Sequence, residues 1–213
     1  MLIQNPSRIF KSDLSVWKKE RSCIVKEIVP EDMSGLRKSA EIVLDEDGTF
    51  DTYYPENTTV LMVVLYGEVL INDFEKPVSS EQVFILQSEK SSVLKISNHL
   101  PDEKADVLLF ELKCKTDKSF FSVEDLNISE RNRLIRISEN TGYPNFIGWY
   151  EGRKEESYTL CNKERAIFGM VINGAFEFHN RLLENRDALM ISGIDTLEFE
   201  ALSENALILF LEV

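Results

Sequence analysis

The sequence predicts an all-β protein made of two successive β-barrel or β-sandwich units. Short apolar or alternating runs recur along its 213 residues, and turn-forming residues separate them. Many short strands at such spacing are typical of sandwiches and barrels. The second half also repeats the order of elements in the first, which indicates a duplicated unit.

Strands are predicted in the first half wherever apolar residues dominate or alternate with polar ones. They are expected at Ser22–Val29, Ala40–Leu44, Val60–Leu65, Glu68–Ile71, Gln82–Leu86, Ser92–Ile96 and Val107–Leu112. Only Leu14–Lys19 and Val123–Ser129 are predicted as short helices. The chain should therefore contain very little helix.

The repeat is clearest around two glycines. LYGEVLIND in the first half matches VINGAFEFHN in the second, so that Gly67 corresponds to Gly174. Each glycine lies where one strand ends and the next begins, and a tight hairpin there needs a positive φ that glycine adopts at little cost. We expect two domains, residues 1–122 and 123–213, joined near Lys118–Glu130.

The composition excludes several classes of function. Hydrophobic residues make up 43% and charged residues 29%, as in globular proteins. The net charge of −13 argues against nucleic acid as a partner, because that affinity comes from Lys and Arg. No secretory leader or apolar run of about 18 residues is visible, so no membrane partner is expected. Three widely spaced cysteines suit reduced thiols, and we expect a cytoplasmic protein.

A motif near the first glycine points to a family. Residues Thr49–Thr59 read TFDTYYPENTT and precede the apolar strand that ends at Gly67. This stretch resembles the first motif of the cupin β-barrels in the form found in pirin-related proteins, F-D-T-H-P-H-x-x-x-E. The sequence around Asn132-Arg133-Leu134 resembles the start of the second barrel, which is similar to that of quercetinase-type members. The resemblance implies two tandem cupin barrels, each a double-stranded β-helix or jelly roll.

The residues that bind metal in that family are replaced here. The resemblance places the two His and the Glu at Tyr53, Pro55 and Thr59, and the last His near Leu94. Proline and leucine cannot bind a metal, and a phenol with a pKa near 10 is a poor ligand at neutral pH. We therefore predict no metal and no other cofactor.

Neither the second barrel nor the two histidines is expected to supply a substitute site. The matching register in the second barrel gives Leu160, Asn162, Ala166 and Phe199. His99 and His179 lie in different repeats without a carboxylate at ligand spacing, and both are predicted as solvent-facing turn residues.

The candidate ligand-binding residues all surround the altered motif: Phe50, Tyr53, Pro55, Glu56, Thr59 and Leu94. Aromatic side chains here could stack on a ligand; the preferred alternative is that Tyr53 and Leu94 fill the former metal cavity. The leading hypothesis is a non-catalytic, metal-free bicupin that binds a small molecule or a protein partner, without catalytic residues. A homo-oligomer is left open. The alternative is an enzyme, either a quercetinase-type dioxygenase with an unorthodox site or a metal-free isomerase or lyase that uses Tyr53 and Glu56.

Overall fold

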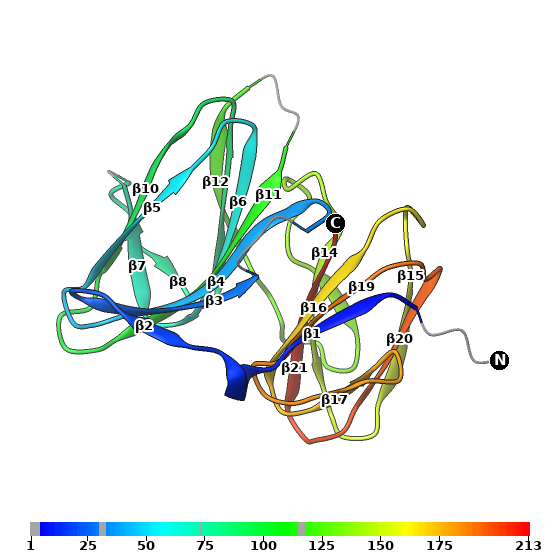
Figure 1. The fold of residues 1–213 in the computed structure, drawn as a ribbon. Coiled ribbons are helices and arrows are strands. Elements are labelled where there is room, and N and C mark those ends of the chain that lie inside the picture. The colour runs from blue at the N-terminus through cyan, green and yellow to red at the C-terminus, as the bar shows by residue number, and fades with distance from the viewer. Residues whose placement is uncertain (1–4, 30–32, 73, 115–117) are drawn as a thin grey trace. The chain divides into compact units, whose positions relative to one another are not determined.

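The computed structural model describes residues 5–29, 33–72, 74–114 and 118–213, and these residues form two compact units (Figure 1). The N-terminal unit comprises Ser15–Leu126 and Asn140–Gly142. The C-terminal unit comprises Met1–Leu14, Asn127–Glu139 and Tyr143–Val213. Each unit has its own sheets and its own hydrophobic core, as expected for a duplicated β fold.

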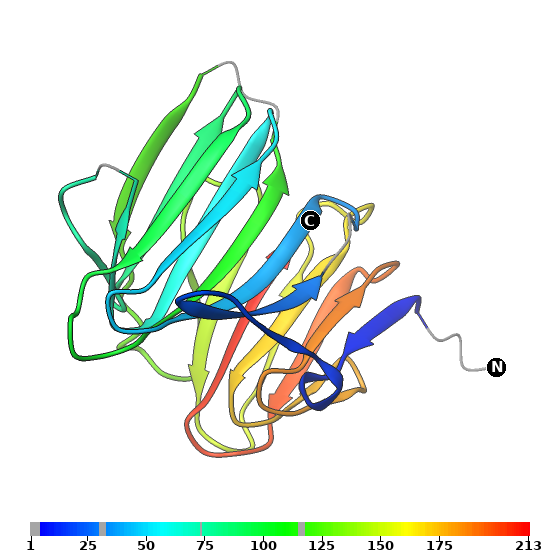
Figure 2. The same cartoon turned by 60° about the vertical axis from the view of Figure 1, so that its left-hand side comes forward.

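The N-terminal unit is a sandwich of two antiparallel sheets (Figure 2). One sheet has seven strands in the order β12-β9-β6-β11-β4-β3-β2, and the other has four in the order β5-β10-β7-β8. The strands are β2 (Trp17–Lys19), β3 (Cys23–Val29), β4 (Leu36–Leu44), β5 (Thr49–Tyr54), β6 (Thr58–Tyr66), β7 (Glu68–Ile71), β8 (Val78–Ser79), β9 (Gln82–Ser88), β10 (Ser92–Asn98), β11 (Ala105–Lys113) and β12 (Phe120–Asp125). All seven strands predicted in this half are present.

Alternation along the strands builds the core of this unit. Every second residue of a strand points to the same face, so the inward residues of the two sheets meet. Met62, Phe84, Ile96 and Leu109 all belong to this core and are at most 3% exposed. Burial of such apolar surface is the main favourable term in folding.

The C-terminal unit repeats this design. Its six-stranded sheet has the order β1-β19-β16-β21-β14-β13, and its four-stranded sheet has the order β15-β20-β17-β18. The strands are β1 (Ser7–Phe10), β13 (Leu134–Arg136), β14 (Asn145–Tyr150), β15 (Glu155–Thr159), β16 (Ile167–Asn173), β17 (Phe176–Phe178), β18 (Leu182–Leu183), β19 (Ala188–Ile191), β20 (Thr196–Ala201) and β21 (Ala206–Glu212).

The two matched glycines adopt the predicted conformation. Gly67 has φ of 79° and joins β6 to β7, and Gly174 has φ of 80° and joins β16 to β17. A Cβ at Gly67 would lie 3.1 Å from the Cβ of Ala105, and one at Gly174 would lie 3.2 Å from that of Ala206. The repeat therefore conserves both the turn and the strand packed against it.

The N-terminal segment belongs to the C-terminal unit, which corrects the predicted boundary at its start. Strand β1 pairs antiparallel with β19, from Ser7 opposite Ile191 to Phe10 opposite Ala188. At the other boundary, residues 123–125 complete β12, which pairs with β9 of the N-terminal unit. Both domain boundaries are set by pairing between strands that are far apart in the sequence. A local sequence pattern does not predict such pairing.

The two predicted short helices are wrong. Val123–Ser129 begins inside β12, and Leu14–Lys19 contains β2, because both segments find a strand partner at a sheet edge. Within the described ranges the one helical element is a 3₁₀ turn, η1 (Ser12–Leu14). No helix among these residues is long and apolar enough to cross a membrane.

Candidate functional site

The first part of the altered motif, Thr49–Tyr54, forms β5, and its side chains alternate between the two faces of the strand. Phe50, Thr52 and Tyr54 are buried, whereas Tyr53 is 63% exposed. Thr52 lies directly opposite Leu94 of β10, so these two residues face the barrel interior together. Tyr53 lies opposite Val93, which is 51% exposed, so this pair faces outward.

The six residues predicted to bind a ligand do not form one site. Phe50 and Leu94 lie in the core of the N-terminal unit. Pro55 is partly buried and Glu56 is exposed in the turn after β5. Thr59 is fully buried, and its Oγ1 has no hydrogen-bond partner. The interior position predicted for Tyr53 belongs to Tyr54 instead, because a shift of one residue reverses the face of every side chain in a strand.

The interior of this barrel offers no ligand set for a transition metal. Such a site needs imidazole nitrogens or carboxylates that converge on one point, whereas Thr52, Tyr54 and Leu94 occupy the inner face here. Across the described residues, no group of three or more His, Cys, Asp or Glu side chains could hold a metal ion. A divalent metal of the cupin type does not fit the residues that are present.

The two histidines differ in environment. His99 is exposed, as predicted. His179 is only partly exposed, with φ of 48°, and its Nδ1 is buried without a partner. Burial, aided by the positive charge of Arg181, lowers the pKa of His179. It is therefore not a simple solvent-facing residue.

Aromatic rings fill the interior of the C-terminal unit. Phe176, Phe178 and Phe210 are fully buried, and Tyr150 is 1% exposed. Gly169 makes room for this packing, because a Cβ there would lie 2.5 Å from the ring of Phe178. Of the positions that match the metal motif in this unit, Leu160, Ala166 and Phe199 are buried and Asn162 is exposed.

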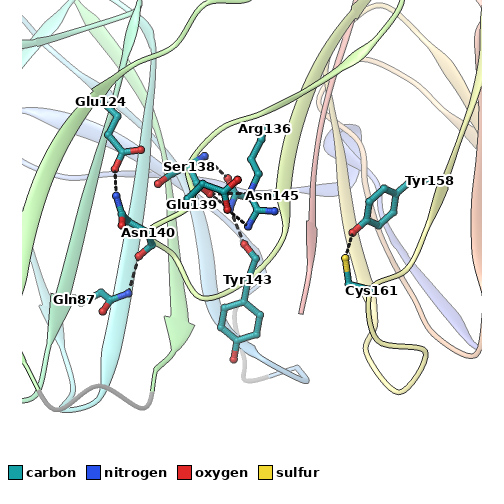
Figure 3. Close-up of polar contacts among 10 residues, drawn as sticks. All are labelled: Gln87, Glu124, Arg136, Ser138, Glu139, Asn140, Tyr143, Asn145, Tyr158 and Cys161. Carbon is teal, nitrogen blue, oxygen red and sulfur yellow. Dashed lines mark hydrogen bonds and ion pairs between the residues drawn. The ribbon is translucent and has the colours of Figure 1, made fainter.

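A buried carboxylate organises the loop after β15 in the C-terminal unit. Glu212 is fully buried and accepts hydrogen bonds from Tyr158 Oη at 2.7 Å and from the backbone N of Cys161 and Asn162 at 2.8 and 2.9 Å. Tyr158 also contacts Cys161 Sγ at 3.4 Å (Figure 3). Burial and these contacts raise the pKa of Tyr158. Because Glu212 already has several partners, its role is structural.

A hollow on the outer side of the same unit is acidic. It has a volume of about 500 Å³ and is lined by Glu155, Glu156, Ser157, Glu177, Asn180, Glu198, Phe199 and Glu200. Glu200 lies opposite both Glu155 and Glu177 on neighbouring strands, and it pairs with Arg153 at 3.3 Å. Most of these carboxylates are exposed, so water satisfies them without a ligand.

The N-terminal unit contains an apolar cavity that the sequence did not reveal. Its volume is about 310 Å³, and it is lined by Ile71, Asn72, Phe74, Phe84, Leu86 and Phe121. The ring centroids of Phe74 and Phe121 are 5.3 Å apart in an edge-to-face arrangement, and those of Phe84 and Phe121 are 6.3 Å apart and stacked. Three phenylalanines thus form one wall of aromatic surface.

A buried carboxyl group lies in the same interior. Glu111 of β11 is 4% exposed, and its Oε1 has no hydrogen-bond partner. It lies directly opposite Val60, a core residue, so it points into the barrel. Burial raises the pKa of Glu111, against the opposing effect of Lys38 and Arg37. In the sequence, this buried acid could have been recognised because Glu111 is the single acidic residue in the apolar run VLLFEL, residues 107–112.

Comparison with known proteins supports the fold seen here. Residues 146–213 match the family model described as the quercetinase C-terminal cupin domain. No curated protein sequence matches the chain.

Several solved structures share the whole fold at low sequence identity. The bacterial pirin YhhW from Escherichia coli, in complex with nickel(II), is 13% identical with a TM-score of 0.82, over 97% of this chain and 99% of that one. The protein GK1651 from Geobacillus kaustophilus is 12% identical with a TM-score of 0.77, over 100% and 97%. Quercetin 2,3-dioxygenase from Acinetobacter baumannii is 13% identical with a TM-score of 0.70, over 96% and 78%. The C-terminal part of the chain thus matches a quercetinase C-terminal cupin domain, and the chain shares its two-barrel fold with these structures.

Proposed function

We propose that this protein is a non-catalytic bicupin whose N-terminal barrel binds a small aromatic molecule. The observation that carries the proposal is the cavity of about 310 Å³ with Phe74, Phe84 and Phe121 in its wall. Ligand pockets in proteins range from about 300 to 1,000 Å³ and are mostly apolar. An apolar cavity of about 150 Å³ is large enough for benzene, so this one suits a molecule of two fused rings.

The metal chemistry of similar proteins is not carried over to this chain. The nickel(II) of the similar bacterial pirin and the reaction named for the quercetin dioxygenase belong to those proteins. Here the inner face of β5 and β10 presents Thr52, Tyr54 and Leu94, which do not form a transition-metal site.

An enzyme that works without a metal has less support. The alternative isomerase or lyase relied on Tyr53 and Glu56 as an interior acid–base pair. Tyr53 is 63% exposed on the outer face of β5, and Glu56 is exposed in a turn. General acid–base catalysis needs both groups within hydrogen-bond reach of one substrate, in a site that limits the access of water.

The test is binding of 1-benzofuran, a flat two-ring molecule without a hydrogen-bond donor, measured by calorimetry on the full chain. We expect saturable binding at one site with a dissociation constant of ~0.1–1 mM, a usual affinity for so small a ligand. Leu86→Trp should weaken it at least tenfold, because the larger ring fills the cavity that Leu86 lines. Phe121→Ala should also weaken it, and since Phe121 is 54% exposed this variant should fold.

The matched control is Leu182→Trp, which adds the same ring at a residue of the C-terminal unit that is 57% exposed. Its affinity for 1-benzofuran should equal that of the wild type. No saturable binding to the wild type, or equal binding by the Leu86→Trp and wild-type proteins, would overturn the proposal.

A further inference from the structure

The cavity of the N-terminal unit is lined from both of its sheets. Phe84 and Leu86 belong to β9, and Phe121, which lies directly opposite Leu86, belongs to β12 at the edge of the seven-stranded sheet. Ile71 ends β7 of the four-stranded sheet, and Asn72 follows it. A molecule in the cavity would therefore contact residues of both sheets.

The lining of the cavity changes from buried and apolar to exposed and polar. Ile71 is 1% exposed and Phe84 is 3% exposed, whereas Phe121 is 54% exposed. Asn72 is also exposed, and among the described residues that line the cavity it is the one with a polar side chain. A ligand can thus keep one edge in the apolar interior and meet Asn72 at its other edge.

Two hydrogen bonds to β10 orient the side-chain amide of Asn72. Its backbone N donates to the carbonyl O of Lys95 at 2.9 Å, and its Oδ1 accepts from the backbone N of Lys95 at 2.8 Å. A backbone N–H can only donate, so the oxygen of the amide and not its nitrogen faces Lys95. Nδ2 has no acceptor among the described residues, and it is the side-chain group left to bind a molecule in the cavity.

The backbone around Asn72 holds this donor in place before a ligand arrives. Asn72 has φ of 49°, a left-handed conformation that asparagine adopts more readily than most residues. The backbone N of Phe74 donates to the carbonyl O of Ile71 at 2.9 Å, which holds the chain on the other side of Asn72. A group that is already held in its binding position loses little conformational entropy when a ligand binds.

We propose that Nδ2 of Asn72 is the hydrogen-bond donor of the N-terminal cavity, and that the barrel selects flat aromatic molecules with an acceptor atom in the plane of the ring, such as a ring nitrogen. This inference rests on the proposed binding function and adds the ligand class to it. Aromatic molecules that present an N–H at the same edge gain no hydrogen bond, because two donors would face each other.

The experiment compares probes of the same shape by calorimetry on the full chain. 1-Benzofuran and benzoxazole are isosteric fused rings, and benzoxazole has a ring nitrogen where 1-benzofuran has a C–H group. For the wild-type protein we expect benzoxazole to bind about fivefold more tightly, the effect of one net hydrogen bond between neutral groups. Indole, which carries an N–H in the same ring, should bind no more tightly than 1-benzofuran.

The variant Asn72→Asp reverses the chemistry of the group without changing its shape. One carboxylate oxygen can still accept from the backbone N of Lys95, and the other replaces Nδ2 with an acceptor. The preference for benzoxazole over 1-benzofuran should be lost, and indole should become the tightest of the three probes by about threefold.

A second variant and a control separate the role of the amide from effects on the fold. Asn72→Gly removes the amide but still adopts a positive φ, and its two affinities for benzoxazole and 1-benzofuran should agree within about twofold. The control Asn57→Asp makes the same change of charge at an exposed asparagine of the same unit, with φ of 53°. It should keep the wild-type preference.

Each failure points to a different proposal. If neither 1-benzofuran nor benzoxazole binds to the wild type, the binding function itself is wrong. If both bind equally well, if indole binds most tightly to the wild type, or if Asn72→Asp keeps the preference for benzoxazole, the donor role of Asn72 is wrong and the cavity binds by apolar contact alone.

Discussion

Tyr53 and Tyr54 are neighbours in the chain but lie on opposite faces of β5, the first 63% exposed and the second 5% exposed. Tyr54, with Leu94 of β10, belongs to the core that fills this part of the barrel. The tyrosine of the altered motif that faces the interior is therefore Tyr54, and it shares the core with Leu94, an aliphatic residue that cannot bind a metal.

This difference between the two tyrosines predicts a large loss of stability for one alanine variant and almost none for the other. Tyr54→Ala should lower the free energy of unfolding by about 3 kcal/mol, because it leaves a cavity in the core. Tyr53→Ala should change it by less than about 0.5 kcal/mol, as is usual for exposed positions. Urea unfolding of the two variants measures both. If both variants lost the same free energy of unfolding, Tyr53 and Tyr54 would not lie on opposite faces of β5 as described.

Gly169 is predicted to be irreplaceable for steric reasons. Gly169→Ala would place a Cβ 2.5 Å from the Phe178 ring and should cost about 2 kcal/mol of unfolding free energy through overpacking. Gly152→Ala is the matched control, since its Cβ would meet first the mobile end of Glu204 at 3.1 Å. Thermal unfolding should separate the two; a Gly169→Ala protein as stable as the control would contradict the aromatic packing described here.

The contact that holds the N-terminal segment on the C-terminal unit is testable by charge removal. Asp187 is 2% exposed and accepts hydrogen bonds from Lys11 Nζ at 2.5 Å and from the backbone N of Ser12 at 2.8 Å. Asp187→Ala should cost about 3 kcal/mol, because the backbone N of Ser12 and that of Glu184 lose their acceptor and Lys11 is left with its exposed contact with Glu184 at 3.1 Å.

A surface ion pair provides the comparison for that variant. Lys18 and Glu27 are 2.9 Å apart, with side chains 61% and 37% exposed, and Lys18→Met should cost less than about 1 kcal/mol. Chemical denaturation is the measurement. A loss at Asp187 no larger than that at Lys18 would show that the segment is not held by this contact.

Glu111 predicts a characteristic pH dependence of stability. Burial raises the pKa of Glu111, while Lys38 and Arg37 oppose the shift. A folded-state pKa above the unfolded value means that the folded protein binds more protons, so the contribution of Glu111 to stability is greatest below the unfolded pKa. It is lost as pH rises through the folded pKa.

Glu111→Gln should therefore raise the melting temperature at pH 7, where the raised pKa of Glu111 makes the wild type less stable. The gain should shrink at about pH 4, near the ordinary pKa of glutamate, because the wild-type group is then largely protonated. Differential scanning calorimetry at the two pH values gives the comparison. If the rise in melting temperature caused by Glu111→Gln were larger at about pH 4 than at pH 7, the pKa of Glu111 would not be raised. This result would contradict the buried environment assigned to Glu111.

The sequence predicts most of this fold because the alternation of apolar and polar residues along a strand is a local signal. The seven predicted strands of the first half follow from apolar or alternating runs, and the turns at Gly67 and Gly174 follow from glycine geometry. Strands β5 and β8 were not predicted. Strand β1 escapes prediction because its residues are almost all exposed and its pairing with β19 is a long-range event.

The site is harder to predict than the fold. The interior position of Tyr53 was inferred from the family resemblance and not from the alternation of side chains along the strand. A shift of one residue in this alignment moves the side chain to the opposite face of the sheet. The cavity brings Phe74 and Phe121 together from distant parts of the chain, so no local pattern announces it. Glu111 could have been noticed as a lone acid in a buried strand, although its missing partner becomes visible only in the structure.

The most direct test of the central claim, that this cupin frame does not bind a transition metal, is nickel(II) titration of untagged protein followed by desalting and elemental mass spectrometry. Because Thr52, Tyr54 and Leu94 occupy the inner face of the motif, we expect less than about 0.1 equivalent of nickel, iron, copper or zinc to be retained. Retention of about one equivalent of any of these metals, lost on replacement of residues in the N-terminal barrel, would contradict the account.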